Sequence, residues 1–439
     1  MSPRGEITQV LLLLALVTAI RLVFAVQLGL AEDEAYYWVW GQRLAAGYFD
    51  HPPAIAWVIR AGTAIVGDTE AGVRIGGLLL GAVTVGVMVL ASTERVLTAL
   101  MLVSLPLFFL GGILATPDVP LLAAWALGLV AAIQGRWPLV GLACGLAMLS
   151  KYTGVLLLPL IVLADPKALR TRGPWIAAAI AFVVYLPNAW WNWTHDLVSW
   201  AFQLNHVSEA PRRLDFIAAQ FGLAGPILAI VCGGFWARGW RGDRRERLCW
   251  WTSLPVMIVA IWAGGEANWS APAWLGAILG ASQMTPRWRR AGSVGAGVNL
   301  ALCGLVLAHA VRPLVDLPID PLHRLEGGQT LGESVRAWGI DEVYTERYQE
   351  AALIHFYGGV PARALPGVAR PDQYDLWAEP LADRALYVRL WKSTPHLPRL
   401  DGTGYDWEQV FTVTAYAKTT DPTTDRPIAR WNIAEIFQR

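Results

Sequence analysis

Residues 7–53, ITQVLLLLALVTAIRLVFAVQLGL followed by AEDEAYYWVWGQRLAAGYFDHPP, decide the class of this protein. The first part, residues 7–30, is apolar over more than the roughly 20 residues that a helix needs to cross a bilayer. The second part places the carboxylates Asp33 and Glu34 among aromatic residues of the kind that gather at membrane interfaces. These features predict a membrane helix and an outer loop over 31–69, and carboxylates at that depth generally serve a function.

The whole chain is unusually apolar. Of its 439 residues, 55% are hydrophobic, 16% are charged, and 23 are Trp. This composition is too apolar and too rich in interfacial aromatic residues for a water-soluble protein, so it predicts an all-α polytopic membrane protein surrounded by membrane lipids. The net charge of +1 gives no reason to expect a nucleic-acid partner.

Apolar runs predict about eleven membrane helices. They lie near 7–30, 70–91, 96–114, 119–134, 137–150, 152–164, 174–190, 216–236, 249–263, 271–284 and 292–311. If the N-terminus is cytoplasmic, the inner loops carry most of the Lys and Arg, including the five arginines of ARGWRGDRRER at 237–247. Because basic loops stay inside, the first outer loop and the C-terminal region are predicted to lie outside.

The composition changes after residue 311, where charge returns and apolar runs shorten. Helices mixed with short strands are suggested by the patterns of LGESVRAWGI, DEVYTE, YQEAALIHFYGG, ALYVRLW, QVFTVTAYAK and RWNIAEIF. We therefore predict a transmembrane domain over 1–311 and a small extracytoplasmic α/β domain over 312–439. The second domain carries no P-loop, dinucleotide fingerprint or metal-spaced Cys/His set.

The polar residues of the transmembrane domain lie at the outer ends of helices or in outer loops. They are Asp33, Glu34, His51, Asp118, Lys151, Asn188, His195, Asp196, Gln203, Glu266 and Asn268. A transporter should mark the bilayer midplane with ionisable groups or broken helices. Polar chemistry at one face favours an enzyme, and a lipid-linked sugar transporter or flippase and a non-catalytic glycan-binding membrane protein are the alternatives.

The outer compartment lacks nucleotide sugars, so a glycosyl transfer there must use a lipid-linked donor. A polyprenyl phosphate leaving group is already anionic and needs cations rather than a proton, whereas an acceptor hydroxyl needs a general base. Asp33 is the candidate base, and Glu34 can orient it or bind sugar hydroxyls. Lys151 or Arg74 can hold the phosphate.

Five stretches resemble the GT-C glycosyltransferases of the protein O-mannosyltransferase and aminoarabinose transferase type, in particular their bacterial members. They are DEAYYWVWGQRLAAGYFDHPP at 33–53, ATPDVPLLAAW at 115–125, LSKYTG at 149–154, WNWTHDLVSWAFQ at 191–203 and EANWSAPAW at 266–274. A weaker likeness extends to RYQEAALIHFYGG at 347–359. The resemblance implies an inverting glycosyltransferase of the bacterial inner membrane, which moves a sugar from a polyprenyl-phosphate donor to a lipid, glycan or protein acceptor at the periplasmic face.

The resemblance also implies roles for single residues. Asp33 corresponds to the family's essential loop acid and Glu34 to its neighbour. Asp118 corresponds to a second functional aspartate, and Lys151 to a lysine near the donor phosphate. The full predicted binding set is Asp118, Lys151, Arg74, Tyr48, His51, His195, Glu266 and Asn268.

One departure from the family limits what can be transferred. Relatives that bind lipid A phosphates often carry an Arg shortly after the acidic pair. Here Ala35, Tyr36 and Tyr37 follow instead, so the resemblance does not define the acceptor class.

Simpler roles compete with each of these functions. Asp33 can be the N-cap of an interfacial helix, and Asp118 can cap the fourth membrane helix. Lys151 and Arg74 can extend to lipid head groups, and Glu266 can be a solvated loop acid.

No metal or other cofactor is predicted. His51, His195 and Glu266 could converge on an ion, but no HxxxH-like spacing supports this, and a hydrogen-bonded loop histidine is the commoner case. The tryptophans of NAWWNWTHDLVSWAFQ at 188–203 are expected to form an interface belt, with stacking on sugar rings as the alternative. Arg21, which lies inside the first span, can either extend outward or bind an anion in the bundle.

Overall fold

The computed structural model describes residues 3–207, 213–317, 320–390, 405–417 and 426–438. The chain divides into two compact units, which are described separately below. Unit 1 comprises Met1–Phe24, Ala45–Val58 and Arg74–Leu305, and unit 2 comprises Ala25–Leu44, Ile59–Val73 and Val306–Arg439. The segment that carries Asp33 therefore belongs to the same unit as the C-terminal region. The domain boundary predicted at residue 311 stays a prediction.

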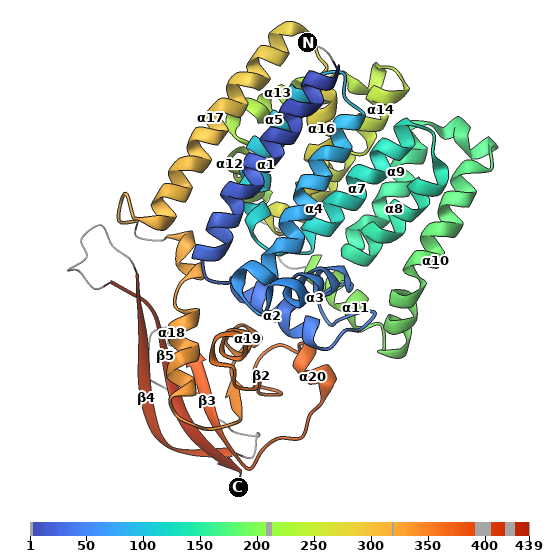
Figure 1. Cartoon of the computed structure of the whole chain (residues 1–439). Helices are drawn as coiled ribbons and strands as arrows, with labels where there is room; N and C mark the ends of the chain where they lie inside the picture. Colours follow the sequence, from blue (N-terminus) through green and yellow to red (C-terminus); the bar gives the residue numbers. More distant parts are fainter. Residues whose placement is uncertain (1–2, 208–212, 318–319, 391–404, 418–425, 439) are drawn as a thin grey trace. The chain divides into compact units, whose positions relative to one another are not determined.

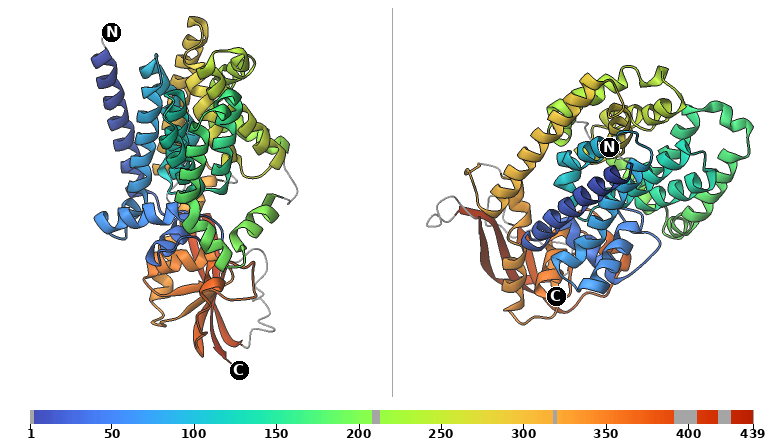
Figure 2. Two further views of the ribbon diagram at one scale, coloured as in Figure 1. Left: turned by 90° about the vertical axis from the view of Figure 1, so that its right-hand side faces the viewer. Right: turned by 45° about the horizontal axis from the view of Figure 1, so that its top comes forward.

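Unit 1 is built from helices, several of which continue into unit 2 (Figures 1 and 2). They are α1 (Pro3–Gln27), α3 (Ala54–Val66), α4 (Glu70–Leu90), α5 (Arg95–Ser104), α6 (Pro106–Phe109), η1 (Gly111–Ile113), α7 (Asp118–Ile133), α8 (Trp137–Ser150), η2 (Tyr152–Leu156), α9 (Leu157–Ala164), η3 (Pro166–Arg170), α10 (Gly173–Thr194), α11 (Val198–Val207), α12 (Arg213–Ala224), α13 (Pro226–Trp236), η4 (Gly239–Arg241), α14 (Arg244–Trp251), α15 (Leu254–Ala263), η5 (Ala267–Ser270), α16 (Ala271–Ala281) and α17 (Pro286–Val311).

Within the described residues, four helices are long and apolar enough to cross a membrane, namely α1, α4, α10 and α17. Two bent pairs can add a span each: α5 turns by 76° into α6 and η1, and α12 turns by 107° into α13. Each predicted span coincides with a helix or an interrupted helix, which confirms the helical class. The predicted number of about eleven spans stays a prediction.

α6 ends at Phe109, and Arg21 donates hydrogen bonds to backbone carbonyls at this helix end. Proline lacks an N–H, so the helix breaks between Leu105 and Pro106. The Arg21 guanidinium, 5% exposed, donates from Nε to the Phe109 carbonyl at 3.1 Å and from Nη2 to the Phe108 carbonyl at 2.5 Å. Lipid offers no hydrogen-bond donors, so this internal donor stabilises the bent segment.

Segment 45–58, part of the predicted first outer loop, lies against α10 and α11. Three side chains of these helices donate to its backbone carbonyls: Asn188 to Ala46 at 2.7 Å, Ser199 to Tyr48 at 2.6 Å, and Gln203 to Asp50 at 2.7 Å. Gly47 packs so closely that a Cβ there would lie 2.4 Å from the Trp191 ring. The segments that carry the motifs GYFDHPP and WNWTHDLVSWAFQ therefore contact each other.

Unit 2 combines helices with one mixed sheet (Figure 1). Its elements are α2 (Glu32–Gln42), η6 (Pro321–Leu325), α18 (Gly328–Arg336), β1 (Val343–Thr345), α19 (Tyr348–Leu353), η7 (Ile354–Gly358), β2 (Ala362–Ala364), α20 (Gln373–Trp377), β3 (Arg384–Leu390), β4 (Tyr405–Ala417) and β5 (Arg426–Gln438). The strand order is β2-β1-β3-β5-β4. β1 pairs in parallel with β2 and β3, whereas β5 is antiparallel to β3 and β4.

The predicted C-terminal α/β region is confirmed. Among the stretches that suggested helices mixed with short strands, ALYVRLW, QVFTVTAYAK and RWNIAEIF overlap β3, β4 and β5. The sheet core contains Tyr344, Leu365, Ala385, Tyr387 and Ile436. α2, which comes from the first outer loop, packs against α19 and η7 of the same unit. The sequence did not predict β2 and α20, which are short.

Candidate functional site

Three predicted residues meet in unit 1 around one carboxylate. The Lys151 Nζ donates to Asp118 Oδ1 at 2.8 Å, and the Asn268 Nδ2 donates to Asp118 Oδ2 at 2.6 Å. Asp118 is 7% exposed and Lys151 9%. A buried ion pair is tolerated when hydrogen bonds satisfy its atoms, and here both carboxylate oxygens are engaged.

The LSKYTG motif places Lys151 in this cluster. α8 ends at Ser150, Lys151 itself is extended with φ −156° and ψ 142°, and η2 begins at Tyr152. A Cβ at Gly154 would lie 2.3 Å from the Ala147 carbonyl carbon, so glycine allows η2 to fold back onto the end of α8. The break in the helix therefore has a sequence cause, and it turns the lysine toward Asp118.

The two partners of Lys151 come from other helices. Asp118 is the first residue of α7, where the partial positive charge of the helix N-terminus favours a carboxylate. Asn268 lies in η5, and a pair of hydrogen bonds holds this turn. The Ser270 Oγ donates to Gln220 Oε1 at 2.6 Å, and the Gln220 Nε2 donates to the Ala267 carbonyl at 3.0 Å.

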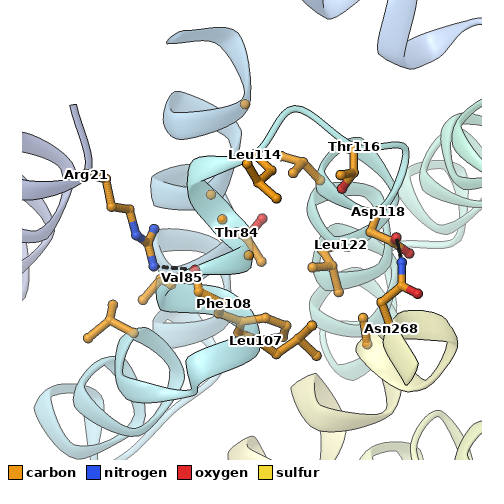
Figure 3. A pocket seen from close by; sticks show the side chains of 17 residues that line it. Arg21, Thr84, Val85, Leu107, Phe108, Leu114, Thr116, Asp118, Leu122 and Asn268 are labelled. Carbon is orange, nitrogen blue, oxygen red and sulfur yellow. Dashed lines mark hydrogen bonds between the residues drawn. The ribbon is translucent and has the colours of Figure 1, made fainter. Parts of the chain in front are cut away.

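Two apolar cavities border the ion pair. The first, here called the Lys151 cavity, has a volume of about 510 Å³ and is lined by Lys151, Tyr152, Tyr185, Trp200, Trp269 and mostly aliphatic neighbours. The second, the Asp118 cavity, has a volume of about 200 Å³ and extends from Asp118 and Asn268 to Arg21 (Figure 3). Lys151 thus lines one cavity and its partner Asp118 lines the other.

Asp33 lies in unit 2 and has different surroundings. It is exposed, in the first turn of α2, and its Oδ1 accepts a hydrogen bond from the Tyr348 hydroxyl at 3.2 Å. The N-cap of α2 is Ala31, not Asp33. Glu34 is 1% exposed, and its Oε2 accepts from the Ala31 N–H at 2.9 Å, so this carboxylate stabilises the start of the helix.

Tyr348 is held in place by aromatic and charged neighbours from unit 2. Its ring centroid lies 4.2 Å from that of Tyr36, and the Arg370 guanidinium lies 4.8 Å from it. Next to it, the buried Glu350 pairs with Arg347, and burial raises the pKa of Glu350 above its ordinary value. The sequence did not single out Tyr348, although the RYQEAALIHFYGG likeness at 347–359 contains it.

The remaining predicted binding residues lie outside the Asp118 cluster. Within the described part of the chain, the hydrogen bonds of the Asp118 carboxylate come from Lys151 and Asn268. Arg74 is fully buried in α4, and Glu266 is an exposed residue at the start of η5. Their predicted binding roles stay predictions.

Tyr48, His51 and His195 belong to the outer-loop contact of unit 1. The Tyr48 hydroxyl accepts from the Ala45 N–H at 3.0 Å, and burial raises the pKa of Tyr48 to about 12, so this phenol stays protonated at neutral pH. The His51 carbonyl accepts from the Tyr48 N–H. The His195 ring stacks on Trp191 at 4.1 Å, and its Nδ1 lies 2.8 Å from the Trp191 carbonyl.

The His, Cys, Asp and Glu side chains of the described residues bear on whether the protein could hold a metal ion. Among these described residues, no three or more such side chains form a group that could hold a metal ion.

Sequence comparisons identify similar glycosyltransferases. Residues 50–191 match the dolichyl-phosphate-mannose-protein mannosyltransferase family, a stretch that contains Asp118 and Lys151 but not Asp33. The lipid A galacturonosyltransferase of Rhizobium johnstonii is 33% identical over 320 residues, which cover 65% of this chain and 66% of that protein. The undecaprenyl phosphate-α-4-amino-4-deoxy-L-arabinose arabinosyl transferase 1 of Sodalis glossinidius is 26% identical over 316 residues, which cover 61% of this chain and 56% of that protein. The chain thus spans under two thirds of these relatives' lengths.

The fold is similar to that of ArnT from Cupriavidus metallidurans. The apo structure of ArnT matches with a TM-score of 0.67 and 16% identity over 97% of each chain. The structure bound to undecaprenyl phosphate has the same TM-score at 15% identity, over 99% of this chain and 98% of ArnT. The fold likeness therefore includes both units.

Proposed function

We propose that this chain, which belongs to the protein O-mannosyltransferase and aminoarabinose transferase superfamily of GT-C glycosyltransferases, moves a sugar from a polyprenyl-phosphate donor to an acceptor. The chain is a multi-pass protein of the bacterial inner membrane. The distribution of Lys and Arg supports a cytoplasmic N-terminus and a periplasmic C-terminal domain. The observation that carries the proposal is the buried Lys151–Asp118 pair at the edge of a large apolar cavity.

The Lys151 cavity suits a polyprenyl phosphate. An ammonium group has three N–H donors, and Asp118 uses one of those of Lys151. The others can bind a phosphate at the edge of the cavity, where charge-assisted hydrogen bonds are strong. The apolar lining suits the isoprenoid chain. Asp118 pairs with the ammonium and fixes its position.

Asp33 is the proposed general base. It is exposed, and the Tyr348 hydroxyl orients its carboxylate. In the proposed step, the carboxylate takes the proton from the acceptor hydroxyl while the acceptor oxygen forms a bond to the anomeric carbon. The bond between that carbon and the phosphate oxygen breaks, and polyprenyl phosphate leaves with the electron pair. Attack opposite the leaving group inverts the anomeric carbon.

The relatives support transfer over transport, since their names describe transferases of galacturonic acid and aminoarabinose. The polar cluster of unit 1 also fits an enzyme. The hydrogen bonds of its ion pair are formed within one group of neighbouring helices. A transporter would instead need polar binding sites along a path through the membrane.

A binding assay tests the proposed donor site. We expect Lys151→Ala to weaken the binding of undecaprenyl phosphate to the purified protein by about tenfold or more, because a charge-assisted contact to the phosphate is lost. Native mass spectrometry with titrated undecaprenyl phosphate measures this change. Lys167→Ala is the matched control, because Lys167 is exposed in η3. Equal binding by both variants and the wild type would assign Lys151 a purely structural role.

A further inference from the structure

A basic and aromatic surface lies at the ends of two candidate membrane spans of unit 1. α13 and η4 belong to a bent pair of helices whose second half ends at Arg241, and the span formed by α17 begins at Pro286. Both ends place Arg next to Trp, in ARGWR at 237–241 and PRWRR at 286–290. Tryptophan at the end of a membrane helix typically lies at the level of the lipid head groups. This surface is therefore expected to face that layer.

The two helix ends contact each other. The Arg238 Cζ lies 6.0 Å from the centroid of the Trp288 ring, and a Cβ at Gly234 of α13 would lie 2.6 Å from that ring. In a second contact of this kind, the Arg241 Cζ lies 4.4 Å from the centroid of the Trp240 ring. Both arginines are exposed, and Trp240 is 48% exposed. We call Arg238, Trp240, Arg241 and Trp288 the Arg–Trp surface.

Neighbouring arginines are held by acidic residues of the protein itself. The Arg244 Nε donates to Asp165 Oδ2 at 2.9 Å, and Arg289 pairs with Glu94. Within the described part of the chain, neither arginine of the Arg–Trp surface forms such an ion pair. Their guanidinium groups can therefore bind an anion from outside the chain.

The two acidic residues of the same loop bind backbone groups. Asp243 Oδ1 accepts from the Glu246 N–H at 2.8 Å, and Glu246 Oε2 accepts from the Asp243 N–H at 3.1 Å. This capping box stabilises the start of α14. Residues 237–247 carry five arginines against these two acidic residues, so the loop as a whole is positive.

Arg245 adds donors to the same region. It lies in the first turn of α14, which packs against η4. Its Nε and Nη2 atoms are buried, and they have no hydrogen-bond partner among the residues that the structure describes. Buried N–H groups without an acceptor are costly, and the oxygen atoms of a bound anion would satisfy them.

Phosphate is the anion that this arrangement fits. The planar guanidinium group presents paired N–H donors that match the oxygen atoms of a phosphate. The tryptophan rings and the ends of apolar helices favour a phosphate that belongs to the bilayer, because basic groups at the membrane surface attract anionic lipids.

We propose that the Arg–Trp surface binds the head group of an anionic phospholipid. This lipid is neither the sugar donor nor the acceptor, and the inference does not depend on the proposed function. Basic loops in general orient a membrane protein. The proposal is more specific, because it assigns lipid binding to Arg238 and Arg241 and not to the basic loops as a whole.

Two matched double variants test the site. Arg238→Gln with Arg241→Gln removes both arginines of the surface. Arg170→Gln with Arg172→Gln removes the same charge from two exposed arginines at and just after the end of η3. Each purified full-length protein is titrated with cardiolipin, whose head group carries two phosphates, and native mass spectrometry measures the binding.

We expect the first double variant to bind cardiolipin about tenfold or more weakly than the wild type, because each basic residue near an anionic head group strengthens binding about fivefold. The second double variant should stay within about twofold of the wild type. Neither should change the binding of phosphatidylcholine or undecaprenyl phosphate. A cardiolipin analogue with a photoreactive diazirine near its phosphates should label residues 234–245 and 286–291 of the wild type.

Several results would overturn the proposal. Unchanged binding in the first double variant, or equal loss in both, would mean that cardiolipin binds the basic loops without a defined site. Displacement of cardiolipin by inorganic pyrophosphate at the same concentration would indicate a site for free phosphate. Binding of a short RNA with the same dependence on the two arginines would indicate a nucleic-acid partner. If the first double variant does not fold, Arg241→Gln alone should weaken cardiolipin binding about fivefold.

Discussion

Asp118 and Asp33 both lie in the first turn of a helix, yet their surroundings differ. Asp118 is 7% exposed, and both of its oxygens accept hydrogen bonds from Lys151 and Asn268. Asp33 is exposed, and the described hydrogen bond to its Oδ1 comes from the Tyr348 hydroxyl. A carboxylate whose two oxygens are engaged inside a bundle is a fixed charge, whereas an accessible one can exchange a proton with a substrate. We therefore propose binding for the first and acid–base chemistry for the second.

The largest effect is expected on stability, when Asp118 is replaced. Asp118→Ala leaves the Lys151 ammonium buried without its partner, and breaking a buried pair in this way costs about 3–5 kcal/mol. We expect a clear fall in the thermal midpoint of the detergent-purified protein, measured by tryptophan fluorescence.

A double variant checks this explanation. Asp118→Ala combined with Lys151→Met removes both charges, so most of the lost stability should return. If the double variant is as unstable as Asp118→Ala, the lost stability comes from packing rather than from an unpaired charge. The difference in role between Asp118 and Asp33 would then not be supported.

The next effect concerns turnover. A positioned base typically contributes 10²–10⁴-fold, so Asp33→Asn should lower the rate of sugar transfer at least about 100-fold. Because Asp33 is exposed, the thermal midpoint should stay near that of the wild type. The assay follows transfer from a polyprenyl-phosphate sugar with purified enzyme.

Glu32→Gln is the control, since Glu32 lies in the same first turn of α2. Transfer by Asp33→Asn at a rate near the wild type would exclude this residue as the base. A small loss of rate together with weaker donor binding would instead indicate an acceptor that is already ionised.

The smallest effect should come from the hydroxyl that contacts Asp33. Tyr348→Phe removes one hydrogen bond to a partly solvated carboxylate, worth about 0.5–1.5 kcal/mol, and so should lower kcat by about two- to tenfold. The aromatic contact with Tyr36 is retained.

In the double variant Asp33→Asn with Tyr348→Phe, the second substitution should add almost nothing, since its effect acts through the carboxylate. Fully multiplicative effects would mean that Tyr348 acts independently of Asp33.

The helices of this protein were predictable because hydropathy is a local property. Each predicted span coincides with a helix or an interrupted helix, and breaks such as those at Pro106 and Gly154 have visible sequence causes. Arg21 was harder to interpret. Its residue type and depth suggest an anion or the lipid surface, but its observed partners are two backbone carbonyls at the end of α6, 87 and 88 positions away.

The sequence by itself determined the class, the approximate spans, the C-terminal α/β region and the identities of Asp33, Asp118, Lys151 and Asn268 as candidates. Only the tertiary structure decided how they combine. The contacts of Asp118 with Lys151 and Asn268 cross 33 and 150 positions, and that of Tyr348 with Asp33 crosses 315. Such pairings depend on which helices become neighbours when the chain folds. Which helices become neighbours depends on packing across the whole unit, so it cannot be predicted from a local pattern of residues.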